Sequence, residues 1–214
     1  MFELIFTERK KMFALKSKSV KTELYRKAIH LSFLWMPMVI MLCPRNFCIV
    51  LFAVLTALNI IVEYAAFQKT TFFGTLFRKM FIKTLRNKEI NHTTFVPSGS
   101  IYILAAALLV SVCFLPKAAA AAMCIVLIAD SCAALIGKFF GTFRFSNGKS
   151  VEGTTAFLVS AILICRFFFP AISPAALCLT AFLATAAEFF ENKTGVDDNL
   201  SVPLISGFIL NLVI

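Results

Sequence analysis

The chain has 214 residues, 60% of them hydrophobic, and a mean hydropathy of +0.88. Soluble domains contain about 45–50% apolar residues, so this composition argues against a soluble domain and favours the lipid bilayer as the solvent. The formal net charge of +10 does not indicate a nucleic-acid partner, because the basic residues flank the apolar runs, where anionic lipid headgroups attract them.

Apolar runs recur along the whole chain. A membrane-spanning helix needs about 20 mostly apolar residues, with about 17 as the lower limit. We therefore predict an all-α polytopic transmembrane bundle of about seven spanning helices, forming a single membrane-embedded domain over residues 1–214. The predicted helices cover residues 28–43, 47–67, 99–115, 118–139, 153–169, 171–187 and 200–214.

Lysine and arginine are distributed unevenly between the two sides of this predicted bundle. They concentrate in the N-terminal segment 1–27 and the loop 68–98, whereas the opposite side has only Arg45, Lys117 and Arg166. The positive-inside rule then places the N-terminus in the cytoplasm. We expect a multi-pass protein of a bacterial cytoplasmic membrane whose polar segments face the cytoplasm.

Two of these cytoplasmic segments carry further expectations. Segment 1–27 is too long for the basic region of a signal peptide, so we expect it to be retained. Within the loop 68–98, residues 72–88 are amphipathic at helical spacing. They predict either a helix in the membrane interface or a solvated helix packed on the bundle.

The first polar cluster lies at the start of the first predicted helix. Glu23, Lys27 and His30 share one helical face, and Arg26 lies on the same turn. Flanking by positive charge explains Arg26 and Lys27 but gives no reason for Glu23 and His30.

Two acidic residues fall within predicted membrane helices, where ionisable groups are costly and usually functional. For Asp130, in helix 118–139, we favour a functional role over a structural polar contact. For Glu63, near the cytoplasmic end of helix 47–67, both interpretations stay open because its carboxylate can reach the interface.

A stripe of small residues follows Asp130 at helical spacing and includes Gly137 and Gly141. Small residues permit close packing of membrane helices. Glycine also lets a phosphate group approach the backbone. The stripe by itself does not decide between these two functions.

The run GKSVEG, residues 148–153, opens the predicted helix 153–169. A helix N-terminus with a lysine and hydroxyl groups is typical of an anion site. The run is not a P-loop, because position 143 is phenylalanine where that motif requires glycine, and no strand precedes it.

The last polar cluster, Asp197, Asp198 and Asn199, precedes the final predicted helix, with Glu188 a short loop earlier. Carboxylate and amide oxygens suit Mg²⁺, but Asp and Asn are also good helix caps. Together the clusters provide cations, acids and phosphate-binding backbone on one side of one membrane. Phosphoryl transfer needs this combination.

In this order the clusters resemble the CTP-dependent lipid kinase family, which includes dolichol kinase, phytol kinase and CTP-dependent diacylglycerol kinase. The resemblance extends from residue 23 to about residue 203. It rests on Glu23, Arg26, Lys27, His30, Asp130, Ala133, Gly137, Gly141, Gly148, Lys149, Ser150, Glu152, Gly153, Glu188, Asp197, Asp198, Asn199, Leu200 and Pro203.

The resemblance implies transfer of the γ-phosphate of CTP to a membrane lipid alcohol of the diacylglycerol or polyprenol type, with Mg²⁺ or another divalent cation. The donor preference comes from the family alone. The compact chain looks more like the phytol and diacylglycerol members than the large dolichol kinases.

The resemblance also implies roles for individual residues. The implied catalytic residues are Asp130, Lys149, Arg26 and Lys27. The implied nucleotide and phosphate contacts are Gly137, Gly141, Gly148, Ser150, Glu152, Gly153 and His30. The implied metal ligands are Asp130, Asp197, Asp198, Asn199 and Glu188, and Glu23 and Glu63 are further candidates.

Two alternatives stay open. A CDP-diacylglycerol synthase also uses CTP at a membrane, although its long Asp-rich C-terminal signature is absent here. A small-solute transporter would use Asp130 and Glu63 as coupling carboxylates. The polar residues crowd one face rather than the midplane, which favours the kinase.

Overall fold

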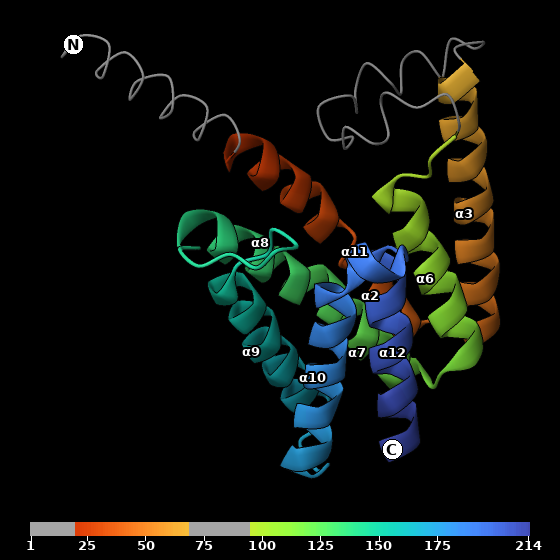
Figure 1. Ribbon diagram of the computed structural model, residues 1–214. Helices are drawn as coiled ribbons and strands as arrows, with labels where there is room; N and C mark the ends of the chain where they lie inside the picture. The colour runs from red at the N-terminus through yellow and green to blue at the C-terminus, as the bar shows by residue number, and fades with distance from the viewer. Residues whose placement is uncertain (1–19, 69–94) are drawn as a thin grey trace, which may run out of the picture.

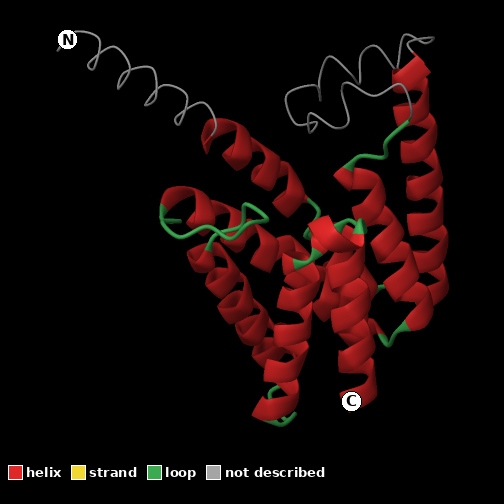
Figure 2. Ribbon diagram, in the orientation of Figure 1, coloured by secondary structure: helices red, strands yellow, loops and turns green. Residues whose placement is uncertain are grey.

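The computed structural model describes residues 20–68 and 95–214, and all the regular elements in these ranges are helices (Figures 1 and 2). The predicted all-α class is confirmed. The expectations for segments 1–19 and 69–94, including the amphipathic helix 72–88, lie outside the described residues. The helices are residues 20–32, α2 (Trp35–Leu42), α3 (Arg45–Gln68), α6 (Gly99–Cys113), α7 (Pro116–Cys124), the π-helical segment η1 (Ile125–Ala129), α8 (Asp130–Phe139), α9 (Val151–Phe168), α10 (Pro174–Phe189), α11 (Glu191–Thr194) and α12 (Asp198–Val213).

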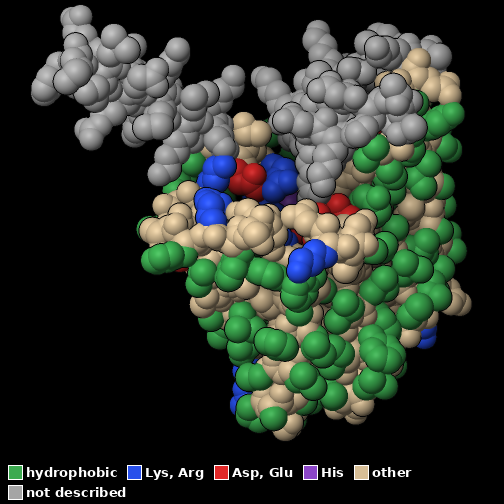
Figure 3. Space-filling model, viewed as in Figure 1, with side chains coloured by type: hydrophobic (Ala, Val, Ile, Leu, Met, Phe, Trp, Pro, Cys, Tyr) green, Lys and Arg blue, Asp and Glu red, His purple; other side chains and the backbone are tan. Residues whose placement is uncertain are grey.

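Three helices are long and apolar enough to cross a membrane: α3, the continuous run from α7 through α8, and α9. Helices α6, α10 and α12 are apolar but shorter. The outer faces carry large exposed side chains such as Phe167 and Leu212. Figure 3 shows hydrophobic side chains over the lower part of this face and charged ones in a hollow near its upper end. This surface is compatible with a membrane protein.

The first predicted helix, residues 28–43, is interrupted near Pro37. The helix of residues 20–32 stops at a turn formed by Phe33 and Leu34, and α2 begins at Trp35. The cause is Pro37, whose ring in a continuous helix would clash with the carbonyl of Phe33. In α2 it occupies the first turn, where its missing N–H has no intrahelical partner to lose. The first polar cluster therefore lies on a separate short helix at the upper end of the bundle (Figure 1).

The predicted helix 118–139 contains the π-helical segment η1 immediately before Asp130. Four of its five residues are buried in the core. Segments of this kind inside α-helices are rare and are frequently found at functional sites. Asp130 is therefore presented by an irregular turn in an otherwise regular membrane-length helix.

Small residues allow close packing in the centre of the bundle. The alanines from Ala118 to Ala122 in α7 are fully buried, and α7 packs against α2, α6 and α12. Gly207 of α12 lies against the ring of Phe114. Membrane helices approach closely where side chains are this small.

We expect Gly207→Val to destabilise the bundle. A Cβ atom at Gly207 would lie 2.6 Å from two carbons of the Phe114 ring, and overpacking of this kind costs about 1–3 kcal/mol. The free energy of unfolding in detergent micelles measures the effect. Ala175→Val, at an exposed position of α10, is the matched control and should change stability by less than about 0.5 kcal/mol. Equal effects of the two substitutions would contradict this packing.

Candidate active site

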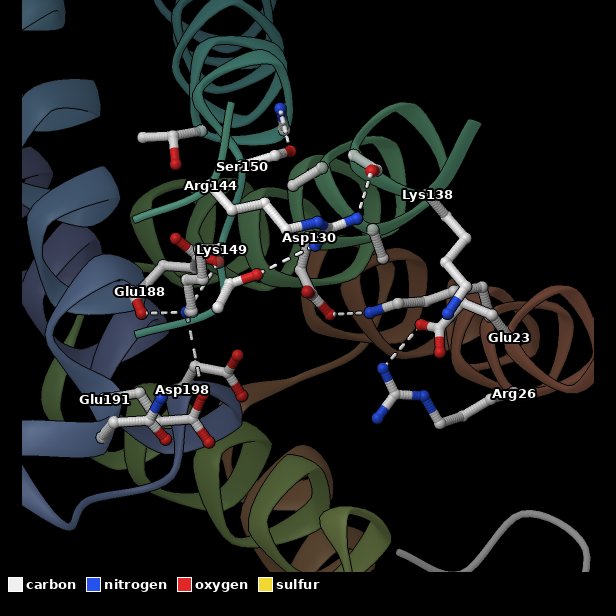
Figure 4. Close-up of a pocket in the computed structure, with 18 residues that line it drawn as sticks. Glu23, Arg26, Asp130, Lys138, Arg144, Lys149, Ser150, Glu188, Glu191 and Asp198 are labelled. Carbon is white, nitrogen blue, oxygen red and sulfur yellow. Dashed lines mark hydrogen bonds and ion pairs between the residues drawn. The ribbon is translucent and has the colours of Figure 1, made fainter. Parts of the chain in front are cut away.

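A cavity of about 360 Å³ lies where the helix of residues 20–32, α8, the start of α9, the end of α10, α11 and the start of α12 meet (Figure 4). Members of all four predicted polar clusters line it. The lining residues are Glu23, Arg26, Lys27, Asp130, Ala133, Ala134, Gly137, Lys138, Arg144, Gly148, Lys149, Ser150, Gly153, Thr154, Glu188, Glu191, Asn192 and Asp198.

Asp130 is held by two residues of the helix 20–32. The Nζ of Lys27 donates to its Oδ2, and the Nε2 of His30 lies 3.4 Å from the same oxygen. The side chains of Lys27 and Asp130 are only 5% and 13% exposed. A buried charge is tolerated only when it is paired, so this ion pair fixes the N-terminal helix against α8.

His30 also connects Asp130 to the π-helical segment. Its Nε2 lies 3.1 Å from the backbone carbonyl oxygen of Val126. A carbonyl only accepts hydrogen bonds, so this contact has Nε2 as the donor. His30 does not line the cavity, whereas Asp130 does. The contacts of His30 therefore orient the Asp130 carboxylate.

The loop between α8 and α9 presents the GKS residues. Gly148 has a φ of +85°, a conformation that glycine adopts without steric cost. Gly148 closes a turn in which its N–H donates to the carbonyl of Phe145 over 2.9 Å. Ser150 is the N-cap of α9, since its Oγ accepts from the N–H of Gly153 over 3.1 Å. Much of this motif is therefore explained by local chain geometry.

Lys149 connects this loop to the end of α10. Its Nζ lies 2.7 Å from Oε1 of Glu188 and 3.7 Å from Oε2 of Glu191, and it donates to the backbone carbonyl of Glu188. A cation at a helix C-terminus is also favoured by the helix dipole. Lys149 lines the cavity, as predicted, but its amine is bound there to carboxylate and carbonyl oxygens.

The glycines of the stripe bring α8 and α9 together. A Cβ atom at Gly137 would lie 2.7 Å from Oγ of Ser150, and one at Gly153 would lie 2.8 Å from the carbonyl oxygen of Ala133. Gly141 also packs against Ser150, but it does not line the cavity. The close-packing interpretation therefore holds for the stripe, while phosphate binding by the glycines stays a prediction.

The acids near α12 were interpreted either as a helix cap or as Mg²⁺ ligands, and the structure gives support for each. Asp197 caps the helix, accepting from the N–H of Asn199 over 3.1 Å and from its side-chain amide over 2.6 Å. Carboxylate oxygens of Glu191, Asp197 and Asp198 all lie within 4.8 Å of one another. We name these three residues the acid corner. Oxygen ligands of this charge and number fit Mg²⁺.

Glu191 was absent from the metal ligands predicted from the sequence. It follows Glu188 by three residues, a helical spacing that could have indicated it. Asn199, which was predicted as a ligand, does not line the cavity, and its amide nitrogen is bound to Asp197.

Several buried polar atoms around the cavity have no hydrogen-bond partner. Of the seven such side-chain atoms among the described residues, four belong to lining residues. Buried polar groups are nearly always paired in proteins, so their grouping here calls for an explanation. A polar ligand could pair with them only if these side chains turn toward the cavity, because each atom itself is closed to solvent. The four atoms are Nε of Arg26, Oγ1 of Thr154, Oε2 of Glu188 and Oδ1 of Asp198.

Two predicted site residues have other contacts. Glu63 is buried and accepts from the N–H of Ser98 over 3.0 Å and from Oγ of Ser100 over 2.9 Å. This network joins α3 to the start of α6, away from the cavity lining. Glu152 accepts from the N–H of Thr142 over 2.8 Å and steadies the α8–α9 loop.

Lys138 and Arg144 line the cavity but were not predicted as site residues. In the sequence they count only as positive charges beside a predicted membrane helix. No spacing motif distinguishes them from the other basic residues, so their position emerges only from the fold.

Comparison with known proteins places the chain in a family. Over 196 residues it is 31% identical to "Uncharacterized protein RP860" of Rickettsia prowazekii, covering 89% of this chain and 94% of that protein. The chain belongs to the same family as this protein. It is also 38% identical to "Uncharacterized protein MJ1137" of Methanocaldococcus jannaschii over 85 residues, 39% of this chain and 42% of that protein. No protein-family model and no solved structure matches the chain.

We expect Lys27→Met to destabilise the protein by about 3–5 kcal/mol, because it leaves the buried carboxylate of Asp130 without its cation. Adding Asp130→Asn to Lys27→Met should recover most of this loss, since the uncompensated charge is then removed. Unfolding in detergent micelles of both single variants and the double variant measures the coupling. Additive effects would show that the pair does not act as a unit.

Proposed function

We propose that the protein is a multi-pass membrane kinase that transfers the γ-phosphate of a nucleoside triphosphate to the hydroxyl of a membrane lipid alcohol. The resemblance makes CTP the expected donor and a diacylglycerol or polyprenol the expected acceptor. One observation carries the proposal: a single cavity gathers basic side chains, acidic side chains and unpartnered buried polar atoms. Its volume lies in the range of small-ligand sites.

The proposal places this cavity at the cytoplasmic side. The cavity is lined by the start of α9, whereas Arg166 lies in the last turn of that helix. Lys117 likewise stands at the start of the run Pro116–Phe139, 13 residues before Asp130. These two of the three basic residues assigned to the far side are thus remote from the cavity along their helices. A charged donor nucleotide would enter from the cytoplasm and the lipid from the bilayer.

In the proposed reaction the lipid hydroxyl oxygen attacks the γ-phosphorus. A new P–O bond to the lipid forms, and the bond between the γ-phosphorus and the β,γ-bridging oxygen breaks, releasing a nucleoside diphosphate. Asp130 orients the hydroxyl and accepts its proton. Lys27 and His30 fix the position of that carboxylate.

The other lining residues would hold the donor. Arg26 and Lys149 add positive charge at the cavity wall, where charge develops on the transferring phosphoryl group, although each is also paired with a carboxylate of the protein. The acid corner would hold Mg²⁺, which neutralises phosphate charge when bound. The unpartnered Oδ1 of Asp198 supports this assignment, since Asp198 is only 7% exposed and lines the cavity.

The reaction can be tested with purified protein, CTP labelled at either the α- or the γ-phosphate, ATP and GTP for comparison, and a panel of lipid alcohols. We expect γ-label, but not α-label, in the extractable lipid. Transfer of α-label with release of pyrophosphate would instead indicate a cytidylyltransferase. Solute flux without nucleotide in proteoliposomes would indicate a transporter.

Asp130→Asn should lower turnover by about 10²–10⁴-fold, the usual contribution of a general base. Glu63→Gln is the matched control, because it makes the same change at a buried carboxylate outside the cavity lining. It should keep turnover per folded molecule. Full activity of Asp130→Asn would remove Asp130 from the mechanism.

The acid corner should bind a divalent cation directly. Mn²⁺ binding, followed by electron paramagnetic resonance without nucleotide, should weaken by at least about tenfold in Asp198→Asn, because one of three charged ligands is lost. Asp130→Asn should bind Mn²⁺ nearly as well, since Lys27 already holds that carboxylate. The reverse order of the two variants would place the ion at Asp130.

A further inference from the structure

Most cations of the cavity are already paired with a carboxylate. Arg26 lies 2.6 Å from Glu23, Lys27 is paired with Asp130, and Lys149 lies 2.7 Å from an oxygen of Glu188. An anionic ligand that relied on these side chains would have to compete with acids of the protein itself. Their positive charge is therefore only partly available.

Arg144 differs in its partners. One terminal nitrogen of its guanidinium donates to the carbonyl of Gly148 over 2.9 Å and the other donates to the carbonyl of Gly137 over 3.3 Å. Both partners are neutral, and none of the ion pairs among the described residues involves Arg144. A guanidinium has five N–H donors, so most of them stay available for a ligand while the charge is uncompensated.

The backbone around Arg144 fixes its position at the cavity wall. Arg144 pairs with Ser150 in an antiparallel bridge. Gly148 stands at the positive-φ turn, and Gly137 lies at the close crossing of α8 and α9. An arginine whose side chain is already ordered loses little conformational entropy when it binds. Figure 4 shows the Arg144 side chain extending across the cavity wall toward Asp130, with dashed lines from its guanidinium to its two backbone partners.

Two further unpartnered donors belong to residues that line the cavity. Nε of Arg26 and Oγ1 of Thr154 are buried and have no hydrogen-bond partner, and both residues line the cavity. Lys138 lines it too without an ion pair among the described residues, but a lysine offers a flexible point charge rather than a fixed planar fork. An anion with several oxygens would satisfy this set.

We propose that Arg144 is the principal contact for the polyphosphate of the nucleotide and that Lys149 is mainly a positioning residue for the loop that carries it. The inference rests on the proposed function for the identity of the anion. The sequence analysis names Lys149 as a catalytic residue and does not name Arg144, so this inference gives the two residues the opposite weights. The expected contact is bidentate, because two phosphate oxygens match the guanidinium fork.

The test is binding of inorganic tripolyphosphate and of CTP to the purified protein in detergent, measured by calorimetry without a lipid acceptor. Arg144→Gln should weaken both ligands by about 10- to 100-fold. Arg144→Lys keeps the charge but not the fork and should fall between this variant and the wild type. The thermal midpoint of each variant reports whether it is folded.

Arg166→Gln is the matched control. Its guanidinium also donates to a backbone carbonyl, that of Pro170, over 2.6 Å, at the other end of α9. This variant should bind tripolyphosphate like the wild type. Equal weakening in Arg166→Gln would mean that the loss is not specific to the cavity and would overturn the inference.

The remaining outcomes separate the inference from the proposed reaction. A folded Arg144→Gln protein with unchanged affinity, or a larger loss in folded Lys149→Gln, overturns the role of Arg144. Binding that depends on Arg144 without phosphate transfer to any lipid supports the anion subsite and counts against the kinase. Absence of tripolyphosphate and CTP binding to the wild type overturns both.

Discussion

The arrangement of the cavity depends on one buried ion pair, between Lys27 and Asp130. These residues are 103 positions apart in the chain, and their side chains are almost fully removed from solvent. Neither charge is tolerable alone in such surroundings. The pair therefore determines where the short N-terminal helix rests, and with it where Arg26 and Glu23 stand relative to α8.

The cavity wall carries both acidic and basic side chains. Acidic side chains gather at the end of α10 and the start of α12, and Arg144 lies on the loop between α8 and α9. A ligand with negative charge and a bound divalent cation would complement both kinds of side chain. A nucleoside triphosphate with Mg²⁺ has this character, which is the basis of the proposed phosphoryl transfer.

The same glycines serve packing and site formation. Gly137 and Gly153 lack side chains where α8 and α9 cross, and both also line the cavity. The close crossing brings the N-cap Ser150 and the Gly148 turn next to α8. A substitution at this crossing would alter stability and cavity shape together, so loss of activity in such a variant would not by itself identify a phosphate contact.

The sequence by itself determined the helical class and most helix positions, because these follow from local hydrophobicity along the chain. It also indicated Asp130, because a charge in an apolar run is costly wherever the helix packs. Only the tertiary structure decided the partners of Lys27 and Lys149 and the places of Glu191 and Arg144 in the cavity. These depend on which helix faces meet, and residue spacing within one helix carries no information about the position of another.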